Sequence, residues 1–144
     1  FSQFDDLTET YGVEKIKTIG DSYMVVSGMP VQKEDHALTL FNLAKEMIKI
    51  SAQFKDHNGN PIKLRIGINS GPAISGVIGK SKFAFDVWGD TINTAARLES
   101  YGSPDCINMS KNTFDLINYK DSNIERKTIQ IRGKGLMDTV LVHT

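Results

Sequence analysis

The chain has little cysteine and no excess of either charge. Cys106 is the only cysteine among 144 residues, which excludes an internal disulfide framework or a cysteine zinc site and favours a reducing, cytoplasmic compartment. Seventeen acidic and seventeen basic residues cancel, so the composition predicts neither a nucleic-acid partner nor contact with an anionic membrane. No apolar run approaches the roughly 18 residues of a membrane span.

The length and the first residues predict one domain cut from a longer protein. A chain that is 40% hydrophobic over 144 residues can form one core, whereas two domains would each be short of apolar side chains. Phe1-Ser2-Gln3 is neither an initiator methionine nor a signal peptide. We therefore expect residues 1–144 to form a single domain that is truncated at its N-terminus.

The spacing of apolar residues predicts an α+β fold, with helices layered on a largely antiparallel sheet. Expected helices cover 1–11, 35–54 and 90–100, with another opened by Ser110; expected strands cover 13–19, 22–26, 62–68, 73–78, 107–109, 124–131 and 139–142. Gly20-Asp21 suits a hairpin turn. Strand 73–78 is expected to pair with strand 62–68, and Asp86 to lie in a loop before the third helix.

Several polar residues could carry chemistry, and each also has an ordinary interpretation. Asp21 suits a turn, and Lys17 suits the outer face of a strand. Asn93 and Arg97, spaced i and i+4, share a helix face that excludes the apolar stripe, which is typical of a solvated surface. Arg132-Gly133-Lys134-Gly135 is either a basic cradle for phosphate or a glycine-rich turn.

Four separated blocks together resemble the signature blocks of class III adenylate and guanylate cyclases, in order and in spacing. They are KTIGDSYMVVSG at 17–28, LRIGINSGPAISGVIG at 64–79, FDVWGDTINTAARLES at 85–100 and IRGKGLMDTVLV at 131–142. The resemblance spans nearly the whole chain. It implies the ferredoxin-like α+β fold of class III cyclase catalytic domains, with the N-terminal strand missing here.

The resemblance also implies a reaction and its cofactors. In this family the ribose 3′-hydroxyl of a nucleoside triphosphate attacks its own α-phosphate, assisted by two divalent cations, Mg²⁺ or Mn²⁺. Asp21 matches the second of the family's two metal-binding aspartates. The first aspartate belongs to a strand that precedes the helix with which this sequence starts.

The remaining matches assign roles around the nucleotide. Asn93 matches the asparagine that orients the ribose, and Arg97 matches the arginine that stabilises charge on the α-phosphate. Arg132 stands where the family usually has a lysine that holds the terminal phosphates, and Lys134 is available to share that contact.

Two further positions bear on the choice of base. Adenine has an acceptor at N1 and a donor at its exocyclic amine, whereas guanine has the opposite polarity at both positions. Lys17 can donate to N1 and Asp86 can accept from the amine, and adenylate cyclases carry lysine and aspartate at these positions. Guanylate cyclases usually have glutamate at the first, and cysteine or a small polar residue at the second. ATP is the expected substrate.

The family arrangement implies a homodimer with sites shared between two cyclase domains, and sensor or membrane domains are possible upstream. A guanylate cyclase and a catalytically silent cyclase-like module that dimerises and regulates are the alternatives. A ferredoxin-like nucleic-acid module is disfavoured, because neither a basic surface bias nor paired aromatic residues on a central strand are visible.

Overall fold

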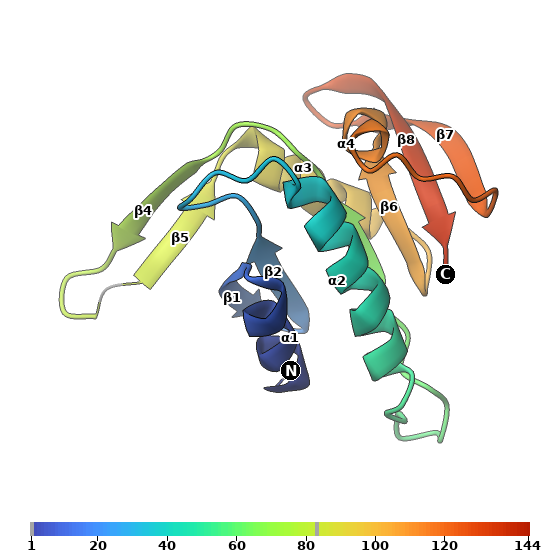
Figure 1. Cartoon of the computed structure of the whole chain (residues 1–144), viewed down its shortest axis with the longest axis horizontal. Coiled ribbons are helices and arrows are strands. Elements are labelled where there is room, and N and C mark those ends of the chain that lie inside the picture. The colour runs from blue at the N-terminus through green and yellow to red at the C-terminus, as the bar shows by residue number, and fades with distance from the viewer. Residues whose placement is uncertain (1, 83) are drawn as a thin grey trace.

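The computed structural model describes residues 2–82 and 84–144. Its helices are α1 (Ser2–Tyr11), α2 (His36–Ser51), α3 (Asp90–Ser100) and α4 (Lys111–Leu116). Its strands are β1 (Glu14–Ile19), β2 (Ser22–Val26), β3 (Arg65–Ile68), β4 (Ile74–Ile78), β5 (Ala84–Trp88), β6 (Cys106–Ser110), β7 (Ile124–Ile131) and β8 (Gly135–His143). Figure 1 shows their arrangement. Within the described residues, no helix is long and apolar enough to cross a membrane.

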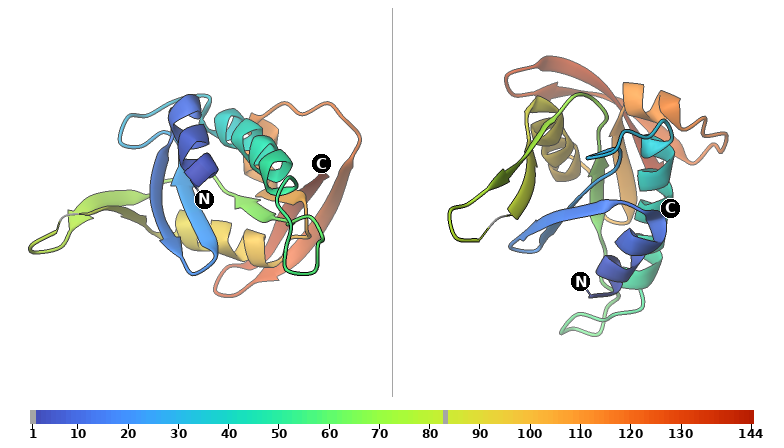
Figure 2. Two further views of the ribbon diagram at one scale, coloured as in Figure 1. Left: turned by 90° about the horizontal axis from the view of Figure 1, so that it is seen from below. Right: turned by 60° about the vertical axis from the view of Figure 1, so that its left-hand side comes forward.

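A four-stranded sheet forms the centre of the fold, in the order β3-β6-β8-β7. The β3–β6 pair is parallel and the other two pairs are antiparallel. All five residues of β6 are buried, because helices cover both faces of the sheet (Figure 2). On one face, α2 and α4 pack against Ile107 and Met109. On the other face, Asn108 donates its side-chain amide to the carbonyl of Leu98 in α3. The expected α+β class is confirmed.

Gly67 in β3 sets how closely α3 can lie against the sheet. A Cβ atom added there would lie 2.4 Å from the carbonyl oxygen of Ala95 and 2.4 Å from the amide nitrogen of Glu99. Real Cβ atoms do not approach backbone atoms this closely, so only glycine permits the contact. The helix that carries Asn93 and Arg97 is therefore held directly on β3.

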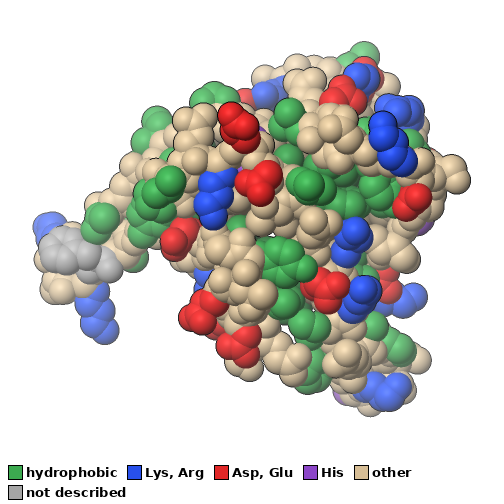
Figure 3. Space-filling view, viewed as in Figure 1, with side chains coloured by type: hydrophobic (Ala, Val, Ile, Leu, Met, Phe, Trp, Pro, Cys, Tyr) green, Lys and Arg blue, Asp and Glu red, His purple; other side chains and the backbone are tan. Residues whose placement is uncertain are grey.

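The second β-hairpin, β4–β5, projects away from the body of the molecule (Figure 1). Hydrophobic side chains are visible along it in the space-filling view (Figure 3). Its large exposed apolar residues are Ile74, Val77, Ile78 and Trp88. We call β4 and β5 with these residues the projecting hairpin. Exposed apolar side chains that gather on one element, as they do here, are typical of an interaction surface.

Three expectations about the strands were wrong. Residues 62–64 are not part of β3, because their backbone groups bond elsewhere: the amide of Leu64 donates to the side chain of Asp105, and the amide of Ile62 donates to Phe54. The strand at 74–78 pairs with β5, not with β3. Asp86 lies in the middle of β5 and not in a loop.

Candidate functional site

Lys17 and Asp86, which are 69 residues apart in sequence, form a direct contact. The Lys17 ammonium donates a hydrogen bond of 3.0 Å to Oδ2 of Asp86. Asp86 is the more enclosed partner, with 15% of its side chain exposed against 42% for Lys17. The contact joins β1 to β5, which belong to two different hairpins. A donor and an acceptor therefore lie side by side at a partly open surface.

A bulge in β1 directs Lys17 toward this contact. The pairing of β1 with β2 shifts between Lys15 and Lys17, and such a bulge re-aims the side chains that follow it. Lys15 pairs with Asp5 of α1 at 3.2 Å, whereas Lys17 reaches β5. The two lysines would share one face of a regular strand. The bulge gives them different partners.

The Asp86 carboxylate is held in its charged form. The hydrogen bond from Lys17 lowers the pKa of Asp86 below the ordinary value of 3.8, and a hydrogen bond from the backbone amide of Val87 lowers it further. A charged carboxylate can only accept hydrogen bonds. Lys17 and Asp86 thus present one donor and one acceptor of fixed polarity.

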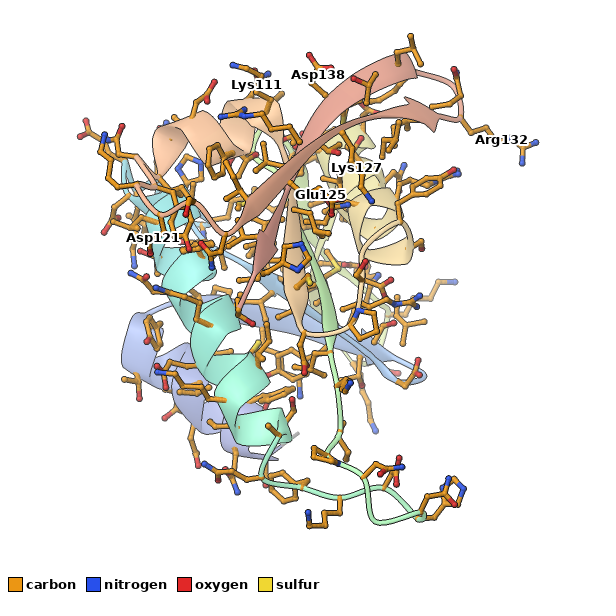
Figure 4. All side chains as sticks on the ribbon, turned by 90° about the vertical axis from the view of Figure 1, so that its right-hand side faces the viewer. Lys111, Asp121, Glu125, Lys127, Arg132 and Asp138 are labelled. Atoms are coloured by element: carbon orange, nitrogen blue, oxygen red, sulfur yellow. The ribbon has the colours of Figure 1, made fainter. Side chains whose placement is uncertain are left out.

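A second group of polar residues surrounds a cavity of about 240 Å³ between α3 and the β7–β8 turn. Asn93 and Arg97 line it from the exposed face of α3, and Arg132 and Lys134 line it from the turn. The full lining is Asp90, Asn93, Thr94, Ala96, Arg97, Ile131, Arg132 and Lys134. Arg132 projects at the end of this hairpin in Figure 4. The expected shared face of Asn93 and Arg97 is confirmed, since Thr94 and Leu98 form the buried face of α3.

The charge of this cavity is strongly asymmetric. Three cationic side chains, Arg97, Arg132 and Lys134, line it with one carboxylate, that of Asp90. Lys134 and Asp90 form an ion pair across it. A cavity with this excess of positive charge favours a ligand with several negative charges, such as a polyphosphate.

Comparison with known proteins decides the family. The chain matches the family described as "Adenylate and Guanylate cyclase catalytic domain" over residues 1–144. This protein belongs to that family.

Both kinds of cyclase are among the relatives of this cyclase domain. It is 44% identical over 141 residues to an adenylate cyclase from Mycobacterium tuberculosis, covering 96% of this chain and 31% of the relative. It is 42% identical over 142 residues to the human guanylate cyclase soluble subunit beta-2, covering 96% of this chain and 23% of the relative. The chain therefore spans less than a third of either relative, and its similarity does not separate the two substrates.

Solved cyclase structures share the fold. The catalytic core of a rhodopsin-guanylyl cyclase with converted specificity, in complex with ATPαS, matches with a TM-score of 0.89 and 38% identity, covering 99% of this chain and 78% of that one. A non-canonical dimeric guanylyl cyclase domain from the aquatic fungus Blastocladiella emersonii matches with a TM-score of 0.81 and 35% identity, covering 98% of this chain and 77% of that one.

The residues of the cyclase signature fall in three places. Lys17 and Asp86 form one pair, and Asn93, Arg97, Arg132 and Lys134 line one cavity. Asp21 belongs to neither group; it is exposed in the two-residue turn between β1 and β2.

Cyclases of this class generally use divalent cations, and Asp21 offers an oxygen ligand of the kind that Mg²⁺ and Mn²⁺ prefer. Within residues 2–82 and 84–144, no group of three or more histidine, cysteine, aspartate or glutamate side chains could hold a metal ion. Among the described residues, Asp21 is therefore a candidate ligand on its own exposed turn.

Asp90 is the residue of the cavity that sequence reasoning missed as a site residue. The helix expected at 90–100 includes it, and Asp90 is the first residue of α3. Its spacing of three residues from Asn93 placed it on the same helix face. This spacing was the sequence signal that could have indicated Asp90 as a residue of the cavity.

Proposed function

We propose that this domain is the catalytic domain of an adenylate cyclase, which converts ATP to 3′,5′-cyclic AMP and pyrophosphate. The observation that carries the proposal is the 3.0 Å contact between Lys17 and Asp86. It brings together a permanent donor and a permanent acceptor, which match N1 and the exocyclic amine of adenine. Guanine would place a donor against Lys17 and an acceptor against Asp86.

The cationic lining of the cavity between α3 and the β7–β8 turn supports a role in binding the phosphates of the nucleotide. We assign Arg97 to the α-phosphate, where charge builds up, and Asn93 to the ribose. Arg132 and Lys134, at the far side of the same cavity, are assigned to the terminal phosphates. Arginine can bind a phosphate with two parallel hydrogen bonds, so Arg132 is a suitable replacement for the family's lysine.

In the proposed reaction the 3′-oxygen of the ribose forms a bond to the α-phosphorus. The bond from that phosphorus to the oxygen bridging to the β-phosphate breaks, the hydroxyl proton is released, and pyrophosphate leaves. When bound, two divalent cations would activate the 3′-hydroxyl and neutralise phosphate charge. Preorganised donors such as Arg97 typically contribute about 3 kcal/mol to transition-state stabilisation.

We propose that the working enzyme is a homodimer. Asp21 lies apart from the nucleotide-binding residues, and the family arrangement takes the metal aspartates from one protomer and the nucleotide contacts from the other. The missing aspartate would come from a strand preceding α1 in the longer protein. The projecting hairpin offers an apolar surface that a second copy could cover. We place the domain on the cytosolic side, where ATP is available and the buried free thiol of Cys106 would remain reduced.

The test exchanges the polarity of the proposed base contacts. In a longer, active form of the protein, Lys17→Glu with Asp86→Cys is expected to lower the kcat/KM for ATP and raise that for GTP. A mismatched polar group costs about 1–3 kcal/mol, so the ratio of the two constants should change at least tenfold. Cyclic AMP formed from ATP and cyclic GMP formed from GTP are measured with Mg²⁺ and with Mn²⁺.

The same assay separates the alternatives. A wild-type protein that prefers GTP is a guanylate cyclase. The 42% identity to a guanylate cyclase subunit is the observation that favours this alternative. A wild-type protein that binds ATP but forms no product in a confirmed dimer is a silent module. An ATP preference that is unchanged in the double variant removes Lys17 and Asp86 from base recognition.

A further inference from the structure

The ion pair between Asp90 and Lys134 links the two walls of the phosphate cavity. Asp90 is the first residue of α3, and Lys134 lies in the turn between β7 and β8. Both side chains line the same cavity as Arg97 and Arg132. Asp90 is the only carboxylate among its lining residues. The lysine assigned to the phosphates is therefore already engaged by a negative charge of the protein.

This ion pair is exposed enough to exchange. The Asp90 side chain is 70% exposed and the Lys134 side chain is 34% exposed. Water competes well for charges at such a position, so the pair holds together only weakly. A polyphosphate entering the cavity would bring several negative charges toward Lys134, and it would also be repelled by the Asp90 carboxylate.

We propose that Asp90 is a built-in counter-ion that competes with the nucleotide's phosphates for Lys134 and so lowers the affinity of the cavity for polyphosphate. Substrate binding then exchanges one partner of Lys134 for another, and product release restores the first. This role rests on the proposed function, because it needs a polyphosphate ligand in the cavity. Asp90 is a positioning residue in this scheme and touches no reacting atom.

The exchange has a consequence for release of the leaving group. Pyrophosphate carries the same terminal phosphate groups as ATP, so Asp90 disfavours both ligands in the same way. A cavity with three uncompensated cations would hold pyrophosphate more tightly. Asp90 therefore favours product release at the expense of substrate affinity.

The test measures the affinity of the 144-residue chain for inorganic pyrophosphate by titration calorimetry in metal-free buffer. Asp90→Asn is expected to bind pyrophosphate about two- to fivefold more tightly than wild type, which is the range for losing one exposed charge pair. Asp90→Ala, which places a strong helix former in the first turn of α3, provides a second variant if Asp90→Asn folds poorly. Asp115→Asn is the matched control, because Asp115 pairs with Lys111 at 2.7 Å outside the cavity.

A double-mutant cycle separates competition for Lys134 from general repulsion. In a Lys134→Gln background, Asp90→Asn should improve affinity by a smaller factor than it does when Lys134 is present. Equal factors in the two backgrounds, or unchanged affinity in Asp90→Asn, would overturn the proposal and leave the phosphate cavity in place. Failure of pyrophosphate to bind wild type and both Asp90 variants would instead contradict the phosphate-binding role itself, and with it the counter-ion role.

Discussion

At the scale of single residues, the contact between Lys17 and Asp86 makes a prediction about pH. Because the pKa of Asp86 is lowered in the folded chain, the contact is fully formed above the ordinary carboxyl pKa and is lost only as pH falls through the lower folded value. We expect the Asp86 carboxyl to titrate below 3.8 in the wild type. Lys17→Met should raise the midpoint, because it removes the largest cause of the shift.

The measurement is a carboxyl-carbon NMR titration of both proteins. Asp5 provides the control within the same spectra, because its pKa is lowered by hydrogen bonds from Tyr23 and Lys15 and not by Lys17. Its midpoint should be the same in wild type and Lys17→Met. An Asp86 midpoint that does not respond to Lys17→Met would show that the two side chains are not in contact in solution.

At the scale of elements, the approach of α3 to β3 predicts a cost for a single methyl group. Gly67→Ala should lower the free energy of unfolding by about 1–3 kcal/mol, because its Cβ meets backbone atoms that cannot move aside independently. Displacement of α3 should also weaken pyrophosphate binding in the cavity, since this helix carries the cationic Arg97. Denaturant unfolding and calorimetry measure the two effects.

Gly59→Ala is the matched control for this substitution. Gly59 has a φ of +83° but nothing within 4 Å of an added Cβ atom, so only the backbone cost of about 1–2 kcal/mol applies. It should leave pyrophosphate affinity unchanged. If both variants lose stability while neither changes affinity, the position of α3 does not control the phosphate cavity.

The elements also show where sequence reasoning succeeded and where it did not. Local signals sufficed for α1, α2, α3 and the β1–β2 hairpin, because periodicity, a capping Gly12 and a tight turn are encoded within a few residues. Strand pairing is different. The apolar pattern of 74–78 is compatible with either neighbour, and only the whole fold places β6 beside β3 and leaves β4 to pair with β5.

The same distinction between local signals and long-range contacts applies to the candidate site. The motifs named Lys17, Asp86, Asn93, Arg97, Arg132 and Lys134, and the structure brings them into one pair and one cavity. The motifs did not indicate the β1 bulge or the ion pair of Asp90 with Lys134, because both depend on contacts between elements distant in sequence. The roles of these residues stay predictions until the variants are measured.

At the scale of the whole molecule, the shared-site arrangement predicts complementation. In a longer, active homodimer, Asp21→Ala and Arg97→Ala should each abolish activity. Random exchange of the two inactive proteins makes half of the dimers mixed, and each mixed dimer has one site with both defects and one with neither. Cyclic AMP production should then recover to about a quarter of the wild-type level. No recovery after confirmed subunit exchange would mean that Asp21 and Arg97 act within one chain.

If the projecting hairpin lies in the dimer interface, a charged substitution on it should weaken dimer formation. Val77 is 63% exposed, and Val77→Lys should weaken self-association about tenfold or more, because a charge replaces an apolar contact in the dimer. The unfolding temperature of the monomer, measured at concentrations where both proteins are dissociated, should be nearly unchanged. Leu116→Lys, at an exposed position on α4, is the control. Sedimentation measures association; equal dissociation constants for Val77→Lys and wild type would exclude this hairpin from the interface.

One rung of the β4–β5 ladder places Asp86 directly opposite Gly76, with Val77 on the next rung. Asp86, the proposed adenine acceptor, and the exposed Val77 thus lie on adjacent rungs of the same β-hairpin. If a second copy displaces this hairpin on binding, it also displaces the base contact. Thermodynamic reciprocity then requires that binding at the base contact changes the affinity for the second copy. If self-association strengthens ATP binding, ATP must strengthen self-association by the same factor, and the nucleotide would then promote assembly of its own enzyme.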